Sequence, residues 1–116
     1  MSMRHNPGCG HLVRLNDFKP LIPDKAWEEI ERLIADAYDG EAVCNLLIDT
    51  LPLDFPKPLM VFEFQEEDEV DDDLEQCEWY VLFWDEDLYE LVEKPALKSM
   101  RQRGLAVKFH VWAKFG

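Results

Sequence analysis

Residues 59–84, LMVFEFQEEDEVDDDLEQCEWYVLFW, decide the fold, because two apolar stretches flank a run of acidic residues there. In residues 59–65 and 77–84, apolar and aromatic side chains recur with a period of two or lie next to one another, which is typical of β-strands. Their closeness in sequence predicts an antiparallel pair. Residues 66–76 would then form a protruding acidic connection between the two strands.

Negative charge is concentrated around this stretch. Residues 63–93 hold 15 of the 25 Asp and Glu side chains and contain no Lys or Arg. Hydrophobic residues make up 47% of the chain, so a folded core is expected and a disordered acidic tail is not. The net charge of −13 destabilises the compact state by self-repulsion, which favours a function for the charge, although many small soluble proteins are acidic.

The first half of the chain predicts helices. Residues 4–11, RHNPGCGH, have the composition of a turn-rich loop, and 11–18 predict a short edge strand. A helix is expected to begin at Asp24 and to end at Gly40, because apolar residues recur at spacings of three and four between them. Within that stripe Trp27 and Tyr38 are expected to be core anchors, and a second helix is expected over residues 41–51.

The second half predicts a sheet. Pro95 favours the start of a short helix over residues 96–103, and residues 105–115 alternate as a last strand. In that strand we expect one set of side chains to point inward (Leu105, Val107, Phe109, Val111, Ala113 and Phe115) and the other outward (Lys108, His110, Trp112 and Lys114). Six Lys and Arg in residues 94–116 are expected to neutralise part of the acidic face.

Residues 1–116 are therefore expected to form a single acidic domain of the α+β class. Two N-terminal helices would pack on a mainly antiparallel sheet of three to five strands, with a short helix before the last strand. No stretch has the length and hydrophobicity of a transmembrane span or signal peptide, so we expect no membrane association. A monomer or a small homo-oligomer is expected.

Sequence motifs for catalysis are not present. The chain contains no phosphate-binding glycine loop, no G-x-S-x-G nucleophile motif and no H-E-x-x-H zinc motif, and residues 68–73 do not match a calcium-binding loop. His5, Cys9 and His11 could ligate zinc, but their spacing matches no common zinc site. With Cys44 and Cys77 the cysteines number three, which favours reduced thiols and a cytoplasmic protein. We predict a non-enzymatic protein without metal or cofactor.

The remaining chemistry is electrostatic, because a dense array of carboxylates resembles the phosphate array of a nucleic acid. In size and charge the chain resembles the small acidic bacterial DNA-mimic proteins, including those that bind the histone-like protein HU, and phage anti-restriction and anti-CRISPR inhibitors. The resemblance implies binding to a basic DNA-binding protein, a nucleoid protein or a defence nuclease complex, at its DNA site, without direct contact to nucleic acid. The residues that carry it are Glu63, Glu66, Glu67, Asp68, Glu69, Asp71, Asp72, Asp73, Glu75, Asp85, Glu86 and Asp87.

Two other interpretations remain open. An immunity protein or antitoxin that neutralises a basic nuclease toxin would use the same electrostatics. A structural or assembly protein would instead use Trp84, Tyr89 and Trp112 as an apolar contact. Salt distinguishes the two kinds of binding, because a complex held by surface charges weakens as ionic strength rises.

Overall fold

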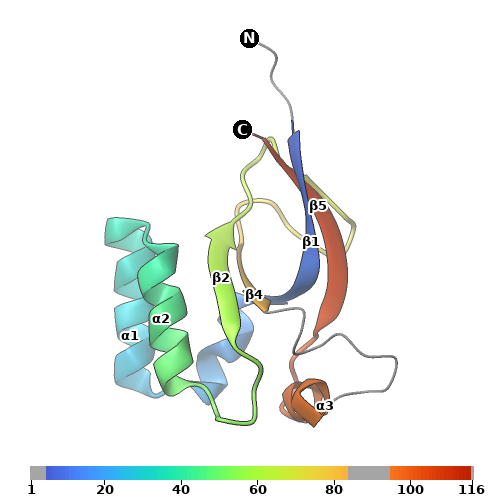
Figure 1. Ribbon diagram of the computed structural model, residues 1–116. Coiled ribbons are helices and arrows are strands. Elements are labelled where there is room, and N and C mark those ends of the chain that lie inside the picture. Colours follow the sequence, from blue (N-terminus) through green and yellow to red (C-terminus); the bar gives the residue numbers. More distant parts are fainter. Residues whose placement is uncertain (1–4, 84–94, 116) are drawn as a thin grey trace.

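The computed structural model describes residues 5–83 and 95–115, and its fold is α+β, as the sequence predicts (Figure 1). Trp84, Tyr89, Asp85, Glu86 and Asp87 lie outside the described residues. In chain order the elements are strand β1 (His5–Arg14), 3-10 helix η1 (Leu15–Leu21), helix α1 (Asp24–Arg32), π-helical η2 (Leu33–Ala37), helix α2 (Gly40–Thr50), strands β2 (Pro58–Glu63), β3 (Glu69–Val70) and β4 (Trp79–Phe83), helix α3 (Pro95–Gln102) and strand β5 (Lys108–Phe115).

The strands form one antiparallel sheet in the order β2-β4-β1-β5-β3. The predicted pairing of the two apolar stretches is confirmed, since Val61 of β2 lies opposite Val81 of β4. The predicted last strand is also confirmed as part of the sheet, and helix α3 precedes it. Figure 1 shows α1 and α2 alongside β2, while α3 lies near the lower end of β5.

Strand β1 corrects the prediction for the N-terminal region. It occupies the centre of the sheet, between β4 and β5, whereas a loop and an edge strand were expected. Gly8 is one of the glycines that predicted a turn, but packing explains its presence, because a Cβ atom there would lie 2.4 Å from the indole nitrogen of Trp112. The Trp112 ring therefore packs directly over the β1 backbone, and only glycine leaves space for it.

The two-helix prediction is confirmed, but the junction between the helices differs from the expectation. Tyr38 adopts a left-handed conformation (φ 51°) after η2, and Asp39 caps α2 through a hydrogen bond from the Ala42 N–H group. Gly40 therefore opens α2 and does not end the preceding helix. A Cβ atom at Gly40 would lie 2.1 Å from the Val61 carbonyl oxygen, so glycine allows α2 to approach β2 closely. Tyr38 is 56% exposed and is not the core anchor that was expected.

Apolar side chains cover both faces of the sheet. On the helical face Val13, Val61 and Val81 pack against α1 and α2 in the main core, where Trp27 is buried as expected. On the opposite face a second apolar cluster comprises Leu12, Phe64, Leu74 and Tyr80, with Phe62, Val70, Leu82 and Trp112 packed against it. The protein therefore has a third layer, formed by the acidic residues 66–76, which covers the second face of the sheet.

The predicted orientation of β5 is wrong within the strand. Leu105 and Val107 are buried, but they precede the strand, and Phe109 and Val111 on it are exposed. His110 is buried and Trp112 is half-buried, on the face that was expected to point outward. The alternation of apolar and polar residues correctly indicated two faces of β5, but residues 66–76 cover the face that carries its polar side chains.

Candidate functional site

Residues 66–76, here called the acidic segment, fold back across the sheet and do not protrude from it. Within the segment, β3 pairs with β5 so that Glu69 lies opposite Ala113 and Val70 lies opposite Trp112. Leu74 is buried in the second apolar cluster. At the base of the segment the Cys77 N–H group donates to the Phe64 carbonyl oxygen at 2.6 Å, which closes the connection.

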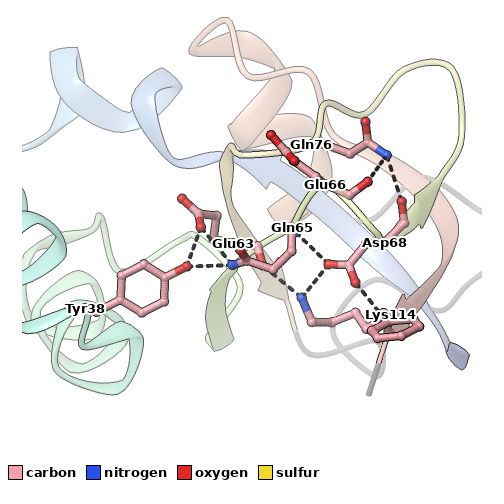
Figure 2. Close-up of polar contacts among 8 residues, drawn as sticks. Tyr38, Glu63, Gln65, Glu66, Asp68, Gln76 and Lys114 are labelled. Carbon is pink, nitrogen blue, oxygen red and sulfur yellow. Dashed lines mark hydrogen bonds and ion pairs between the residues drawn. The ribbon is translucent and has the colours of Figure 1, made fainter. Parts of the chain in front are cut away.

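One carboxylate anchors the segment. Asp68 is only 2% exposed, and its Oδ2 accepts hydrogen bonds from the Gln65 N–H group (2.7 Å) and from Lys114 Nζ (3.0 Å) (Figure 2). Its Oδ1 accepts a third from the Phe115 N–H group at 2.7 Å. Burial raises the pKa of Asp68, but these hydrogen bonds and the Lys114 charge outweigh burial, so the pKa lies below its usual value. Asp68 therefore joins the segment to the end of β5 as a buried anion.

Neutral polar groups hold the two ends of the segment. Gln76 Nε2 donates to the carbonyl oxygens of Glu66 (3.0 Å) and Asp68 (2.9 Å), as Figure 2 shows. The Tyr38 hydroxyl donates to Glu63 Oε1, and Gln65 Nε2 donates to both Tyr38 Oη (2.6 Å) and Glu63 Oε1 (2.9 Å). The strand that leads into the segment is thereby tied to the helical layer.

Three further carboxylates of the segment face basic side chains from the sheet. His110 Nδ1 lies 3.1 Å from an Asp71 carboxylate oxygen, and Lys108 Nζ lies 3.3 Å from Asp73 Oδ2. The third pair joins Arg14, at the end of β1, to Glu75 at a distance of 3.3 Å. With Lys114 against Asp68, these pairs confirm that the basic C-terminal strand neutralises part of the acidic charge internally. The two pairs with largely exposed carboxylates, Lys108–Asp73 and Arg14–Glu75, contribute little stability each, whereas Asp68 and His110 are buried.

The remaining carboxylates of the segment project into solvent. Glu66, Glu67, Glu69 and Asp72 are exposed, and the side chains of Asp73 and Glu75 are each 63% exposed despite their partners. Glu63 is half-buried. The structure thus brings together nine of the twelve predicted site residues in residues 63–75, but Asp68 is a buried structural group and not part of the surface. Asp85, Glu86 and Asp87 lie outside the described residues, so their role stays a prediction.

Alternation in the last strand predicted three members of the basic row on one face of the sheet, and only the fourth, Arg14, was missed. Lys108, His110 and Lys114 lie on one face of β5, and Arg14 lies on the same face at the end of β1. The signal was available, because basic residues at a spacing of two within a strand predict a charged face, and an acidic stretch elsewhere predicts its partner. What no residue pattern revealed is that the acidic segment turns back over this face, since residues 66–76 were expected to protrude.

The residues that the structure describes contain no candidate metal centre. No group of three or more His, Cys, Asp and Glu side chains there could hold a metal ion. Cys9 and Cys77 are exposed, Cys44 is buried, and all three are free thiols. In the described part of the chain, no helix is both long enough and apolar enough to span a membrane. Comparison with protein-family models, with curated proteins and with solved structures gives no match.

Proposed function

We propose that this chain is a non-enzymatic DNA mimic that binds a basic DNA-binding protein through its acidic segment and occupies that protein's DNA site. The observation that carries the proposal is the anchored segment. Its exposed carboxylates project from a backbone that is fixed by β-pairing to β5 and by the buried Asp68 carboxylate.

Charge density and order before binding both support the proposal. Duplex DNA carries a negative charge for about every 1.7 Å of its axis, and basic proteins bind it largely through these charges. Here Glu66, Glu67, Glu69 and Asp72 add exposed negative charge within seven consecutive residues of a chain whose net charge is −13. A segment that is ordered before binding loses less conformational entropy in the complex than a flexible acidic tail would lose.

The charge of the segment also indicates the chemistry of the partner. A surface of this charge repels nucleic acid and anionic lipid and attracts a protein that presents Lys and Arg. The free thiols are compatible with a reducing cytoplasm, where a nucleoid protein or a defence nuclease complex acts. We therefore expect a complex that forms rapidly at low salt, dissociates as salt increases and is displaced by duplex DNA.

The test is capture of partners from the cell lysate on the immobilised protein at low salt, followed by elution in a salt gradient. The key variant replaces Glu66, Glu69 and Asp72 by Gln, Gln and Asn, because these three side chains are exposed on the acidic segment. The matched control, Glu28→Gln with Glu41→Gln and Asp49→Asn, changes the net charge equally on exposed sites of the helices.

We expect the segment variant to weaken the complex at least tenfold at low salt, and the control to weaken it much less. Duplex DNA should compete for the captured protein, and this chain alone should not bind DNA. Identifying the captured protein then separates a DNA-binding regulator from a nuclease toxin. Equal losses in both variants, or a complex that neither salt nor DNA affects, would refute the acidic segment as the binding surface.

A further inference from the structure

A pocket with aromatic walls lies on the helical side of the sheet, between η1, α1 and the start of β4, with a volume of about 420 Å³. Trp27 of α1 and Trp79 of β4 form part of its wall, with Leu15 and Ile34. Trp27 is 6% exposed and Trp79 is half-buried and packed against the main core, so these rings are held in place before any ligand binds.

The same pocket carries two carboxylates. Glu31 lies four residues after Trp27, on the same side of α1, and Glu78 immediately precedes Trp79. Glu78 is half-buried, and its Oε1 accepts a hydrogen bond from Asn16 Nδ2 at 3.4 Å. Aromatic rings and carboxylates around one pocket are the groups that bind a guanidinium or ammonium ion, by cation–π attraction and by charge-assisted hydrogen bonds.

The pocket also adjoins the proposed binding surface. Glu78 follows the acidic segment by two residues, and the Trp79 ring packs edge-to-face on Tyr38 with ring centroids 5.0 Å apart. Tyr38 in turn donates a hydrogen bond to Glu63, at the start of the acidic stretch (Figure 2). The acidic segment and the pocket lie on opposite faces of the sheet, so a partner binds both only if it extends around the end of the sheet where Glu78 follows the segment.

We propose that this pocket is a socket for one arginine or lysine side chain of the basic partner protein. The inference rests on the proposed function for the source of the cation, but the chemistry of the pocket can be tested without the partner. In such a complex the aliphatic stem would pack on Ile34 and Leu15, and the charged head would lie between Glu31 and Glu78. Arginine and tryptophan are enriched among the few residues that dominate interface energy, and the pocket would bring the two types together.

Lys19 also lines the pocket and allows a second, opposite test of cation binding. Its ammonium group is exposed and repels a second cation that enters the same space. Replacing Lys19 should therefore strengthen cation binding, whereas replacing the two glutamates should weaken it. If arginine were attracted only non-specifically to an acidic protein, replacing the pocket carboxylates would weaken binding no more than replacing carboxylates elsewhere.

The first experiment titrates the protein with N-acetyl-arginine amide and with its neutral analogue N-acetyl-citrulline amide, and follows the indole N–H signals of Trp27 and Trp79 by NMR. We expect saturable shifts with the arginine compound only. Glu31→Gln with Glu78→Gln should weaken binding about tenfold, and Lys19→Gln should strengthen it about twofold to threefold. The matched control, Glu41→Gln with Asp49→Asn, has the same net charge as the double pocket variant and should bind nearly as the parent does.

Unshifted indole signals, or equal weakening by the pocket variant and the control, would overturn the inference. The second experiment measures the affinity of the pocket variant for the captured partner, where about a tenfold loss beyond that of the control is expected. Unchanged partner affinity would overturn the socket and leave the acidic segment as the interface. Arginine binding without any basic partner in the lysate would instead support the socket chemistry and refute the proposed function.

Discussion

Replacing Asp68 by Asn tests whether a buried carboxylate holds the acidic segment on the sheet. The substitution keeps the shape of the side chain and removes its charge. Asn offers one acceptor oxygen where Asp68 offers two, and those two oxygens accept from Gln65, Phe115 and Lys114. Either the Gln65 or the Phe115 N–H group then loses its partner and faces the amide NH2 group.

The magnitude follows from these contacts. A buried donor without a partner costs about 1–3 kcal/mol, and hydrogen bonds to a charged group are worth about 1.5–3 kcal/mol each. Lys114 is 36% exposed, so solvent screens its loss of a counter-charge, which adds at most about 1 kcal/mol. We expect Asp68→Asn to lower the free energy of unfolding by about 3 kcal/mol and Tm by about 10 °C for a domain of this size.

The pH dependence of this effect has a definite sign. The pKa of Asp68 is lower in the folded protein than in the unfolded chain, so its carboxylate stabilises the fold fully above the unfolded pKa of about 3.9. That stabilisation is lost as the pH falls through the folded pKa. The difference in stability between the parent and Asp68→Asn should therefore be constant from about pH 7 to 5 and shrink below about pH 4.

Urea unfolding followed by circular dichroism measures the free energy, and amide hydrogen exchange at Gln65 and Phe115 measures release of the segment. The control is Asp72→Asn, which makes the same charge change at an exposed position of the same segment and should alter stability by less than about 0.5 kcal/mol. Equal stability of the two variants at pH 7, with both amides still protected, would refute the anchoring role.

One further substitution and one chemical reaction test the packing. Gly40→Ala should destabilise the protein by about 2 kcal/mol, measured by urea unfolding, because its Cβ atom would lie 2.1 Å from the Val61 carbonyl oxygen and α2 must move away; unchanged stability would contradict this close approach. Iodoacetamide should alkylate Cys9 and Cys77 in the native protein and spare Cys44, which is buried, as mass spectrometry of digested samples would show. Desolvation and nearby carboxylates raise the pKa of Cys77, so its alkylation rate at pH 7.5 should be low for an exposed thiol and increase with pH up to that raised pKa; a rate that saturates at pH 7 would contradict it.

Periodicity predicted those parts of the fold where one sequence signal dominates. The pairing of β2 with β4, helix α2 and the short helix before β5 follow from alternation, from helical spacing and from Pro95. Strand β1 could not be predicted in this way, because Asn-Pro-Gly and a second glycine are local turn signals. Its place in the sheet depends on Trp112, which packs over Gly8 from more than a hundred residues later in the chain.

The candidate site shows the same division. The concentration of acidic residues is evident from sequence, but their individual roles depend on which groups the sheet places beneath them. Asp68 and Asp72 have equal side chains in the same run, yet one is buried against Lys114 and the other is exposed. Strand alternation defines two faces and does not say which is covered, so the orientation of Phe109 and His110 was predicted in reverse.

The central position of β1 has a consequence for how the chain folds as it is synthesised. His5 pairs with Phe115 and His11 pairs with both Phe83 and Phe109, so β1 completes its pairing only when β5 has been synthesised. Helices α1 and α2 and strand β2 can form local contacts earlier, but the middle of their sheet is still missing. Such long-range pairing requires closure of a large loop before any contact compensates for it, which makes folding slow and cooperative. The nascent chain can pair β1 with β4 once β4 has emerged, but the β1–β5 ladder and the side chains of Lys108 and Lys114, which hold the acidic segment, are added only in the final step.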